Sequence, residues 1–154
     1  MKENIIEFLK DVDFSKKYAF ICNQYSNFNE GGHFNKKDLS EIFNVLNFDL
    51  KYASHDKSFF KDYEFDSFRF RFVLTYKYGF IECFYTFFNG SDLPFGGRLN
   101  DISEWENKNF RSEAEHNFPI ATSKEDLYGI LSSLFELHSA LLDKIEKHFS
   151  KKNI

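Results

Sequence analysis

The alternation of hydrophobic and polar residues is strongest in the middle of the chain, from Ser67 to Phe88. Up to Tyr78, every second residue is aromatic or leucine, and polar residues such as Arg69 and Arg71 lie between them. A period of two is typical of a strand with one buried face. After Gly79 both sets of alternate positions are largely apolar, which indicates a strand in the middle of a sheet, covered on both faces. We therefore predict an antiparallel hairpin over 67–88.

Helical spacing of hydrophobic residues appears on both sides of this hairpin. Segments 3–9 and 35–48 each hold an apolar stripe at a spacing close to 3.6 residues. A third stripe begins after Ser123, a candidate N-cap, and continues for roughly seven turns. The aromatic segment 59–65 is interrupted by charged residues and is a candidate edge strand. The pattern predicts a single α+β domain over 1–154, with an antiparallel sheet built around the 67–88 hairpin and packed against N-terminal helices and a long C-terminal helix (about 123–149).

Composition narrows the classes of partner. Hydrophobic residues make up 42% of the 154 residues and charged residues 29%, and the formal net charge is −4. The chain lacks the basic excess that favours binding to nucleic acid, so we expect no nucleic-acid partner and a positively charged protein as the better electrostatic match. The 22 phenylalanines and 8 tyrosines indicate either an aromatic core or, as the second interpretation, an aromatic-lined ligand pocket. Cys22 and Cys83 do not form a disulfide framework, and we expect both to be buried free thiols.

Targeting and membrane signals are weak. The N-terminal residues MKENIIEFLKD contain no long apolar core followed by a small-residue cleavage site, as a secretory signal would. Apolar runs are interrupted by charge before they reach the length of a membrane span. We expect a cytoplasmic protein with no membrane partner.

The residues that carry catalytic chemistry do not form a recognisable motif. Nucleophile elbows, phosphate-binding loops and zinc-binding histidine pairs do not occur, and the Glu113-x-x-His116 spacing is common by chance. We therefore expect no catalytic residue, metal or cofactor, and a protein that is not an enzyme. His138 lies on the apolar stripe of the last helix and is either a hydrogen-bonded core residue or the polar group of a ligand or enzymatic pocket between sheet and helix. Arg69 and Arg71 either bind an anion or pair with acids on the next strand.

The segment from 101 to 116 is the best candidate for a contact with a partner. It holds five acidic residues against Lys108 and Arg111, with the only tryptophan of the chain among them. Interfaces commonly place an aromatic anchor inside a charged rim. The second interpretation is a solvated segment whose tryptophan packs back onto the core. The predicted partner-binding residues are Asp101, Glu104, Trp105, Glu106, Glu113 and Glu115.

The arrangement as a whole resembles the small, acidic, single-domain α+β immunity proteins that bacteria encode beside polymorphic toxins. The resemblance lies in the N-terminal helices, the aromatic hairpin around Tyr78-Gly79-Phe80-Ile81-Glu82, the Gly-rich loop from Gly90 to Gly97 and the long closing helix. It implies a protein that binds one cognate toxin domain and blocks its active site or its access to substrate. The alternative is a small-ligand-binding or enzymatic domain with an aromatic pocket at His138.

Overall fold

A computed structural model describes residues 1–152 of the chain. It contains five helices and five strands. The helices are α1 (Lys2–Asp11), α2 (Phe14–Gln24), α3 (Lys36–Val45), α4 (Leu99–Glu106) and α5 (Lys124–His148). The strands are β1 (Lys51–Ala53), β2 (Ser58–Glu64), β3 (Arg69–Lys77), β4 (Phe80–Phe88) and β5 (Phe95–Arg98). The predicted α+β class is confirmed.

The five strands form one antiparallel sheet in the order β1-β2-β3-β4-β5, so each strand pairs with its neighbour in sequence. The predicted hairpin forms β3 and β4, which pair along their whole lengths from Arg69↔Phe88 to Lys77↔Phe80. Its turn consists of Tyr78 and Gly79, and both have positive φ angles, of 53° and 83°. This conformation matches the right-handed twist of the two strands.

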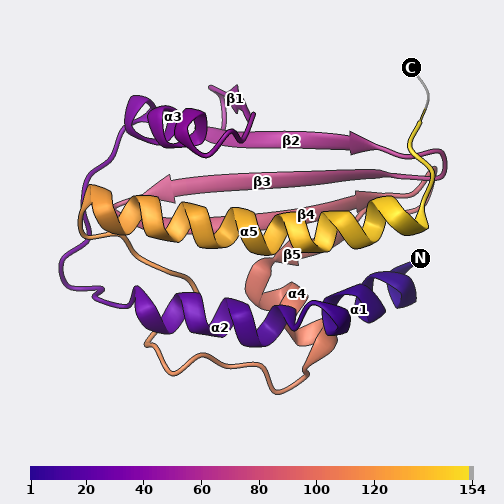
Figure 1. Cartoon of the computed structure of the whole chain (residues 1–154), viewed down its shortest axis with the longest axis horizontal. Helices are drawn as coiled ribbons and strands as arrows, with labels where there is room; N and C mark the ends of the chain where they lie inside the picture. Colours follow the sequence, from indigo (N-terminus) through magenta and orange to yellow (C-terminus); the bar gives the residue numbers. More distant parts are fainter. Residues whose placement is uncertain (153–154) are drawn as a thin grey trace.

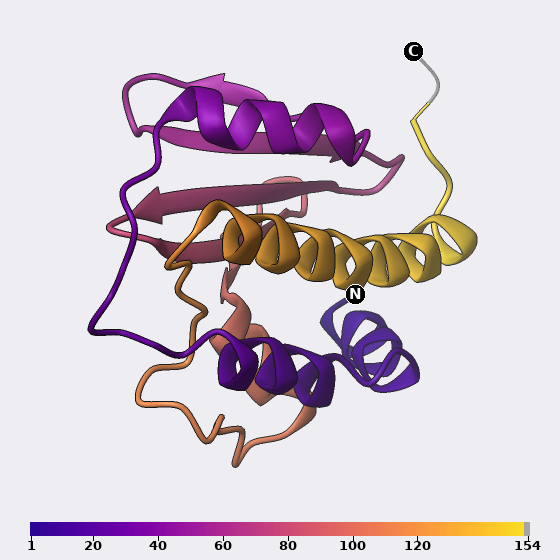
Figure 2. The same ribbon diagram turned by 60° about the vertical axis from the view of Figure 1, so that its left-hand side comes forward.

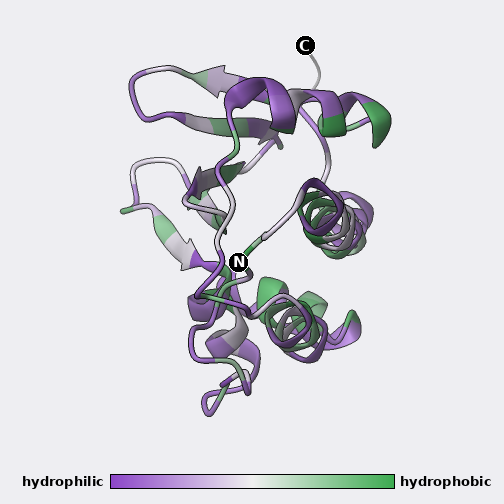
Figure 3. Ribbon diagram, turned by 90° about the vertical axis from the view of Figure 1, so that its left-hand side faces the viewer, coloured by the Kyte–Doolittle hydropathy of each residue, from purple (hydrophilic) through white to green (hydrophobic). Residues whose placement is uncertain are grey.

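The helices follow one another along one face of the sheet (Figures 1 and 2). In the figures α3 lies beside β2, α5 runs along the strands over the middle of the sheet, and α1 and α2 lie beyond α5. Seen from one end, α5 lies to one side of the strands (Figure 3). This order explains the wide buried stripe of α5, because one side of the helix meets the sheet and another meets α1 and α2.

Local signals in the sequence set the helix boundaries. The Asn35 side chain accepts a hydrogen bond from the Asp38 backbone N–H at 2.9 Å, and the Asp38 carboxylate accepts one from the Asn35 N–H, so α3 begins with a capping box. The Ser123 hydroxyl accepts from the Asp126 N–H at 3.1 Å and opens α5. The C-terminal helix was predicted at about 123–149 and is observed at Lys124–His148.

Aromatic residues fill the space between the sheet and the helices. The inward residues of β3 and β4 are buried, including Phe70, Phe72, Tyr85 and Phe87. Fully burying such a side chain contributes roughly 1.5–3 kcal/mol to stability. The abundance of aromatic residues therefore supplies core packing, and the cysteines at 22 and 83 are buried free thiols within the same core.

Two expectations about the strands need correction. The segment at 59–65 was a candidate edge strand, but the three-residue strand β1 pairs with the outer side of β2 at Ser58–Phe60, so only the charged part that follows lies at the edge of the sheet. The second hairpin strand was predicted to be covered on both faces, but on β4 only the face that includes Tyr85 is buried, and the opposite face is half-buried. The reason is contact with neighbouring strands: the guanidinium carbon of Arg98 from β5 lies 5.8 Å from the ring centre of Phe84, and that of Arg69 from β3 lies 4.1 Å from that of Phe88. These arginine side chains cover the aromatic rings without a second layer of helices.

Candidate functional site

The six predicted partner-binding residues belong to α4 and to the loop that follows it, and both lie beside α2 (Figure 1). Glu106, the last residue of α4, reaches the start of α2: its Oε2 accepts a hydrogen bond from the Ser15 backbone N–H at 2.9 Å. Glu113 lies at the other end, where its backbone N–H donates to the Asn23 side chain at 2.7 Å. Eight residues of α helix separate these two anchor points, which corresponds to about 12 Å. The acidic segment therefore runs alongside α2 from its first turn to its last.

Several of these side chains have structural roles. Asp13, the N-cap of α2, has a left-handed backbone and makes no side-chain cap, and Glu106 supplies the missing acceptor from another helix. Asp101 accepts a hydrogen bond from the Arg98 backbone N–H at 3.0 Å and helps to begin α4. Trp105 is half-buried, with its ring centre 6.0 Å from that of Phe95 and the Lys2 ammonium 4.6 Å away.

Four of the six residues are exposed: Asp101, Glu104, Glu113 and Glu115. The indole of Trp105 packs toward the core, as in the second interpretation of this segment. Any partner on this side would therefore meet a row of carboxylates, and its aromatic contact would come from another residue. Whether these carboxylates contact a partner stays a prediction.

An aromatic residue that the sequence analysis did not select lies close to this row. Phe20 on α2 is 68% exposed and borders a groove of about 760 Å³ between α2 and α5. The buried side chains of Ile21 and Leu137 contribute apolar surface to the groove. Charged residues also line it: Asp13, Lys16, Lys17, Arg111, Glu113 and Glu136. The acidic segment thus contributes Glu113 directly to the wall of an apolar groove.

A signal for Phe20 exists in the sequence. When 14–24 is read as a helix, Tyr18, Ile21 and Cys22 share the buried stripe, and all three are buried in the structure. Phe20 falls between these positions, outside the stripe, so its side chain points away from the core. A five-residue apolar run such as Tyr18 to Cys22 fits a helix or a strand equally well by its pattern alone, so the sequence by itself does not show that the Phe20 ring is exposed.

His138 is a core residue. It is 1% exposed, and its Nε2 and Nδ1 atoms lie 2.9 Å from the Tyr63 hydroxyl and 3.0 Å from the Tyr85 hydroxyl. A neutral imidazole can donate from one nitrogen and accept at the other, so both ring nitrogens are satisfied by protein groups. Burial lowers the pKa of His138 to about 3, and the positive charge of Lys61 adds to the effect.

The surroundings of His138 do not favour the alternative of a ligand or enzymatic pocket. The ring centre of Phe72 lies 4.4 Å from that of the imidazole, and those of Phe48 and Phe70 lie 5.6 Å and 5.9 Å away. Aromatic rings and two tyrosine hydroxyls occupy the space and the hydrogen-bonding atoms that a ligand would need. The same arrangement is what a histidine needs in order to be buried at low cost.

Within residues 1–152, no group of three or more His, Cys, Asp or Glu side chains is placed to hold a metal ion. His116, the histidine of the Glu113-x-x-His116 spacing, stacks on Phe118 with ring centres 5.3 Å apart. None of the helices in that range is both long and apolar enough to cross a membrane.

Comparison with protein-family models, with curated protein sequences and with solved structures gave no match.

Proposed function

We propose that this chain is a non-enzymatic immunity protein, which binds a cognate bacterial toxin domain and neutralises it by covering its active site or its substrate path. The contact surface in this proposal is the α2 side of the molecule, meaning the groove between α2 and α5 together with the acidic segment at 101–116. The proposal assigns no chemistry to the chain itself. Neutralisation requires only that the bound chain exclude substrate.

The exposed ring of Phe20 beside an apolar groove is the observation that carries this proposal. Binding energy at protein interfaces concentrates in a few aromatic or arginine residues that fill pockets, surrounded by polar residues that exclude water. Phe20 is 68% exposed, so a partner that covers it buries a large apolar side chain. The neighbouring groove, with Leu137 in its wall, can accept an apolar side chain from the partner in return.

The charge around this surface favours a cationic toxin domain. Segment 101–116 has an excess of three acidic residues over basic ones, and the whole chain has a net charge of −4. The groove itself is balanced in charge, with Asp13, Glu113 and Glu136 against Lys16, Lys17 and Arg111, so the acidic excess of this surface comes from segment 101–116 beside it. Charges of this kind steer association more than they hold the complex together, so they act mainly on the association rate.

The direct test is to express the product of the adjacent gene and to measure its binding and neutralisation by this chain. We expect tight one-to-one binding by titration calorimetry, loss of toxicity on co-expression, and weaker binding as the salt concentration rises. Phe20→Ala should weaken binding at least about thirtyfold, because a truncated hot-spot residue costs upwards of roughly 2 kcal/mol. Changing Glu113 and Glu115 together to Gln should slow association and leave dissociation nearly unchanged.

A matched control is Leu93→Ala. Leu93 is 89% exposed in the loop between β4 and β5, so its truncation also removes exposed apolar surface. Binding should stay within about twofold of wild type in this variant. If the adjacent gene product neither binds this chain nor is neutralised by it, the immunity function is wrong; if it binds but Phe20→Ala and Leu93→Ala behave alike, the function stands and the assigned surface is wrong.

A further inference from the structure

The sheet face opposite the helices carries aromatic and basic residues arranged in rows. In the central row, successive partners across the five strands are Lys51, Phe60, Val73, Phe84 and Arg98. Phe60, Val73 and Phe84 are half-buried. An antiparallel sheet with one solvated face normally places polar residues there, so three adjacent apolar residues at its centre depart from that pattern.

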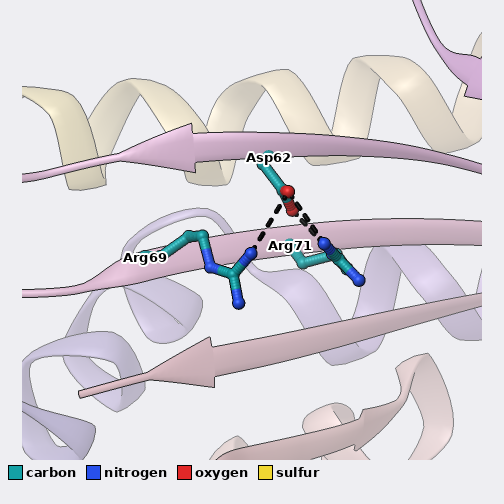
Figure 4. A network of polar contacts seen from close by, with 3 residues as sticks. All are labelled: Asp62, Arg69 and Arg71. Carbon is teal, nitrogen blue, oxygen red and sulfur yellow. Dashed lines mark hydrogen bonds and ion pairs between the residues drawn. The ribbon is translucent and has the colours of Figure 1, made fainter. Parts of the chain in front are cut away.

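Two arginines beside this row are held in fixed positions (Figure 4). Arg71 donates from Nε and Nη2 to the two carboxylate oxygens of Asp62 at 2.6 Å and 2.8 Å, and Arg69 donates from Nη1 at 3.4 Å. The guanidinium carbons also lie over aromatic rings, at 4.1 Å from the ring centre of Phe88 for Arg69 and 5.0 Å from that of Phe60 for Arg71. Ion pairing and stacking restrain both side chains before any partner binds, which reduces the entropy cost of binding.

These arginines retain spare hydrogen-bonding capacity. Two guanidinium groups carry ten N–H donors. Within residues 1–152, Asp62 accepts three hydrogen bonds from the pair, and the side chains of Arg69 and Arg71 are 33% and 34% exposed. The N–H groups that do not bond to Asp62 therefore remain available to a carboxylate or another oxyanion of a partner.

The charge of this face is opposite to that of the whole chain. Basic residues exceed acidic ones by two on this face, whereas the chain has a net charge of −4. The residues counted are Lys51, Arg69, Arg71, Lys77 and Arg98 against Asp62, Glu64 and Glu82. The excess suits a partner with local negative charge. A polyanion such as nucleic acid suits it less, because three acidic residues lie within the face and interrupt the basic residues that a phosphate backbone would follow.

We propose that this face docks an acidic surface of a partner protein, with Arg69 and Arg71 binding partner carboxylates while Phe60 and Phe84 contact its apolar side chains. The site lies on the opposite side of the sheet from the α2 groove. It does not depend on the immunity function, and both surfaces can be occupied at once. Arg69 and Arg71 are the specificity-determining residues, because their planar donors match carboxylates in pairs.

The proposal can be tested by NMR titration of the arginine Nε–Hε signals with two blocked pentapeptides, one alternating Glu and Leu and the other alternating Gln and Leu. The Glu peptide should shift the Arg69 and Arg71 signals and bind at least about tenfold more tightly than the Gln peptide. Arg69→Gln should weaken the Glu peptide severalfold without unfolding the protein, because Arg69 makes only the long contact to Asp62. Arg111→Gln, on the α2 side, is the matched control and should leave peptide binding unchanged.

Several results would overturn the proposal. Equal binding of the two peptides, no binding of either, or an unchanged affinity in Arg69→Gln would each remove the role of partner carboxylates. Stronger shifts with a short oligothymidylate than with the Glu peptide would assign the face to nucleic acid instead. Shifts that grow with protein concentration in the absence of peptide would assign it to a second copy of this chain.

Discussion

Replacing His138 with phenylalanine should make the folded state less sensitive to mild acid. The imidazole is buried, and its pKa falls from an ordinary value of 6.5 to about 3 because the charged form would be desolvated. The unfolded chain binds this proton near pH 6.5, whereas the folded protein does not bind it until about pH 3. The stability that depends on neutral His138 is therefore complete above pH 6.5 and is lost progressively as the pH falls toward 3.

The size of this loss follows from the two pKa values. Between about pH 7.5 and pH 5.0, the difference in proton binding lowers the free energy of unfolding by about 2 kcal/mol. Domains of this size are stable by only about 5–15 kcal/mol, so the loss is a substantial part of the total. Asp38 and Asp62 contribute little to the change in the free energy of unfolding between pH 7.5 and pH 5.0. Hydrogen bonds from Asn35 and Arg71, respectively, lower the pKa values of their carboxyl groups, so these groups titrate below this range.

The measurement is urea unfolding at both pH values, followed by the fluorescence of Trp105, the only tryptophan. Wild type should lose about 1 M in its unfolding midpoint between pH 7.5 and 5.0, for an m-value near 2 kcal/mol per molar urea. His138→Phe should retain the aromatic packing and lose about 2 kcal/mol less over this range. Its stability at pH 7.5 should fall, because the buried Tyr85 hydroxyl loses its partner at a cost of about 1–3 kcal/mol.

Two controls separate protonation from damage to the core. The double variant Tyr85→Phe, His138→Phe removes both hydrogen-bonding partners and should recover part of the stability at pH 7.5 while remaining insensitive to acid. His55→Gln changes an exposed histidine and should keep the pH dependence of wild type. If wild type and His138→Phe lose the same free energy of unfolding between pH 7.5 and 5.0, burial does not keep His138 neutral and the reasoning fails.

Two further substitutions test close packing and helix capping by the same urea assay. Gly79→Ala should cost at least about 3 kcal/mol, because φ is +83° and a Cβ atom would lie 2.5 Å from the Ala121 carbonyl oxygen. Glu106→Ala should cost about 1 kcal/mol, because it removes the acceptor for the Ser15 N–H at the start of α2.

Each of these has a control that differs in one feature. Gly90 also has a positive φ, of +62°, but nothing lies within 4 Å of a Cβ added there, so Gly90→Ala should cost only about 1–2 kcal/mol. A cost for Gly79→Ala no larger than this would show that the turn is not tightly packed. Glu104→Ala changes an exposed acid on the same helix as Glu106 and should stay within about 0.5 kcal/mol of wild type; equal costs for Glu104→Ala and Glu106→Ala would contradict the cap.

The parts of the fold that depend on local sequence could be predicted. The apolar stripe after Ser123 gave the position and length of α5 because a cap and a 3.6-residue period are both local signals. The alternation from Phe68 to Tyr78 gave β3 for the same reason. One of the two interpretations of Arg69 and Arg71 was that they pair with acidic residues on a neighbouring strand. Their ion pairs with Asp62 on β2 confirm this pairing.

The features that depend on contacts between distant residues could not be predicted. The outer face of β4 was read as buried, because the sequence does not show that Arg69 and Arg98 come from neighbouring strands to cover Phe88 and Phe84. The groove beside Phe20 combines α2 with a loop and α5, and α2 lies about a hundred residues before the other two in the sequence. Periodicity describes one element at a time, so a surface built from three elements leaves no local signal.

The position of α5 connects the core with the candidate surfaces. Leu137 and His138 are adjacent in sequence, and about 100° of helical rotation separates their side chains. Leu137 lines the groove beside α2, whereas His138 bonds to Tyr63 and Tyr85 of the sheet. Because the imidazole fixes this turn of α5 against two strands, one wall of the groove is backed by a hydrogen-bonded part of the core. A partner at the α2 side would therefore meet a preformed wall, and we expect the backbone around residues 133–140 to move little on binding, as in other preorganised interfaces.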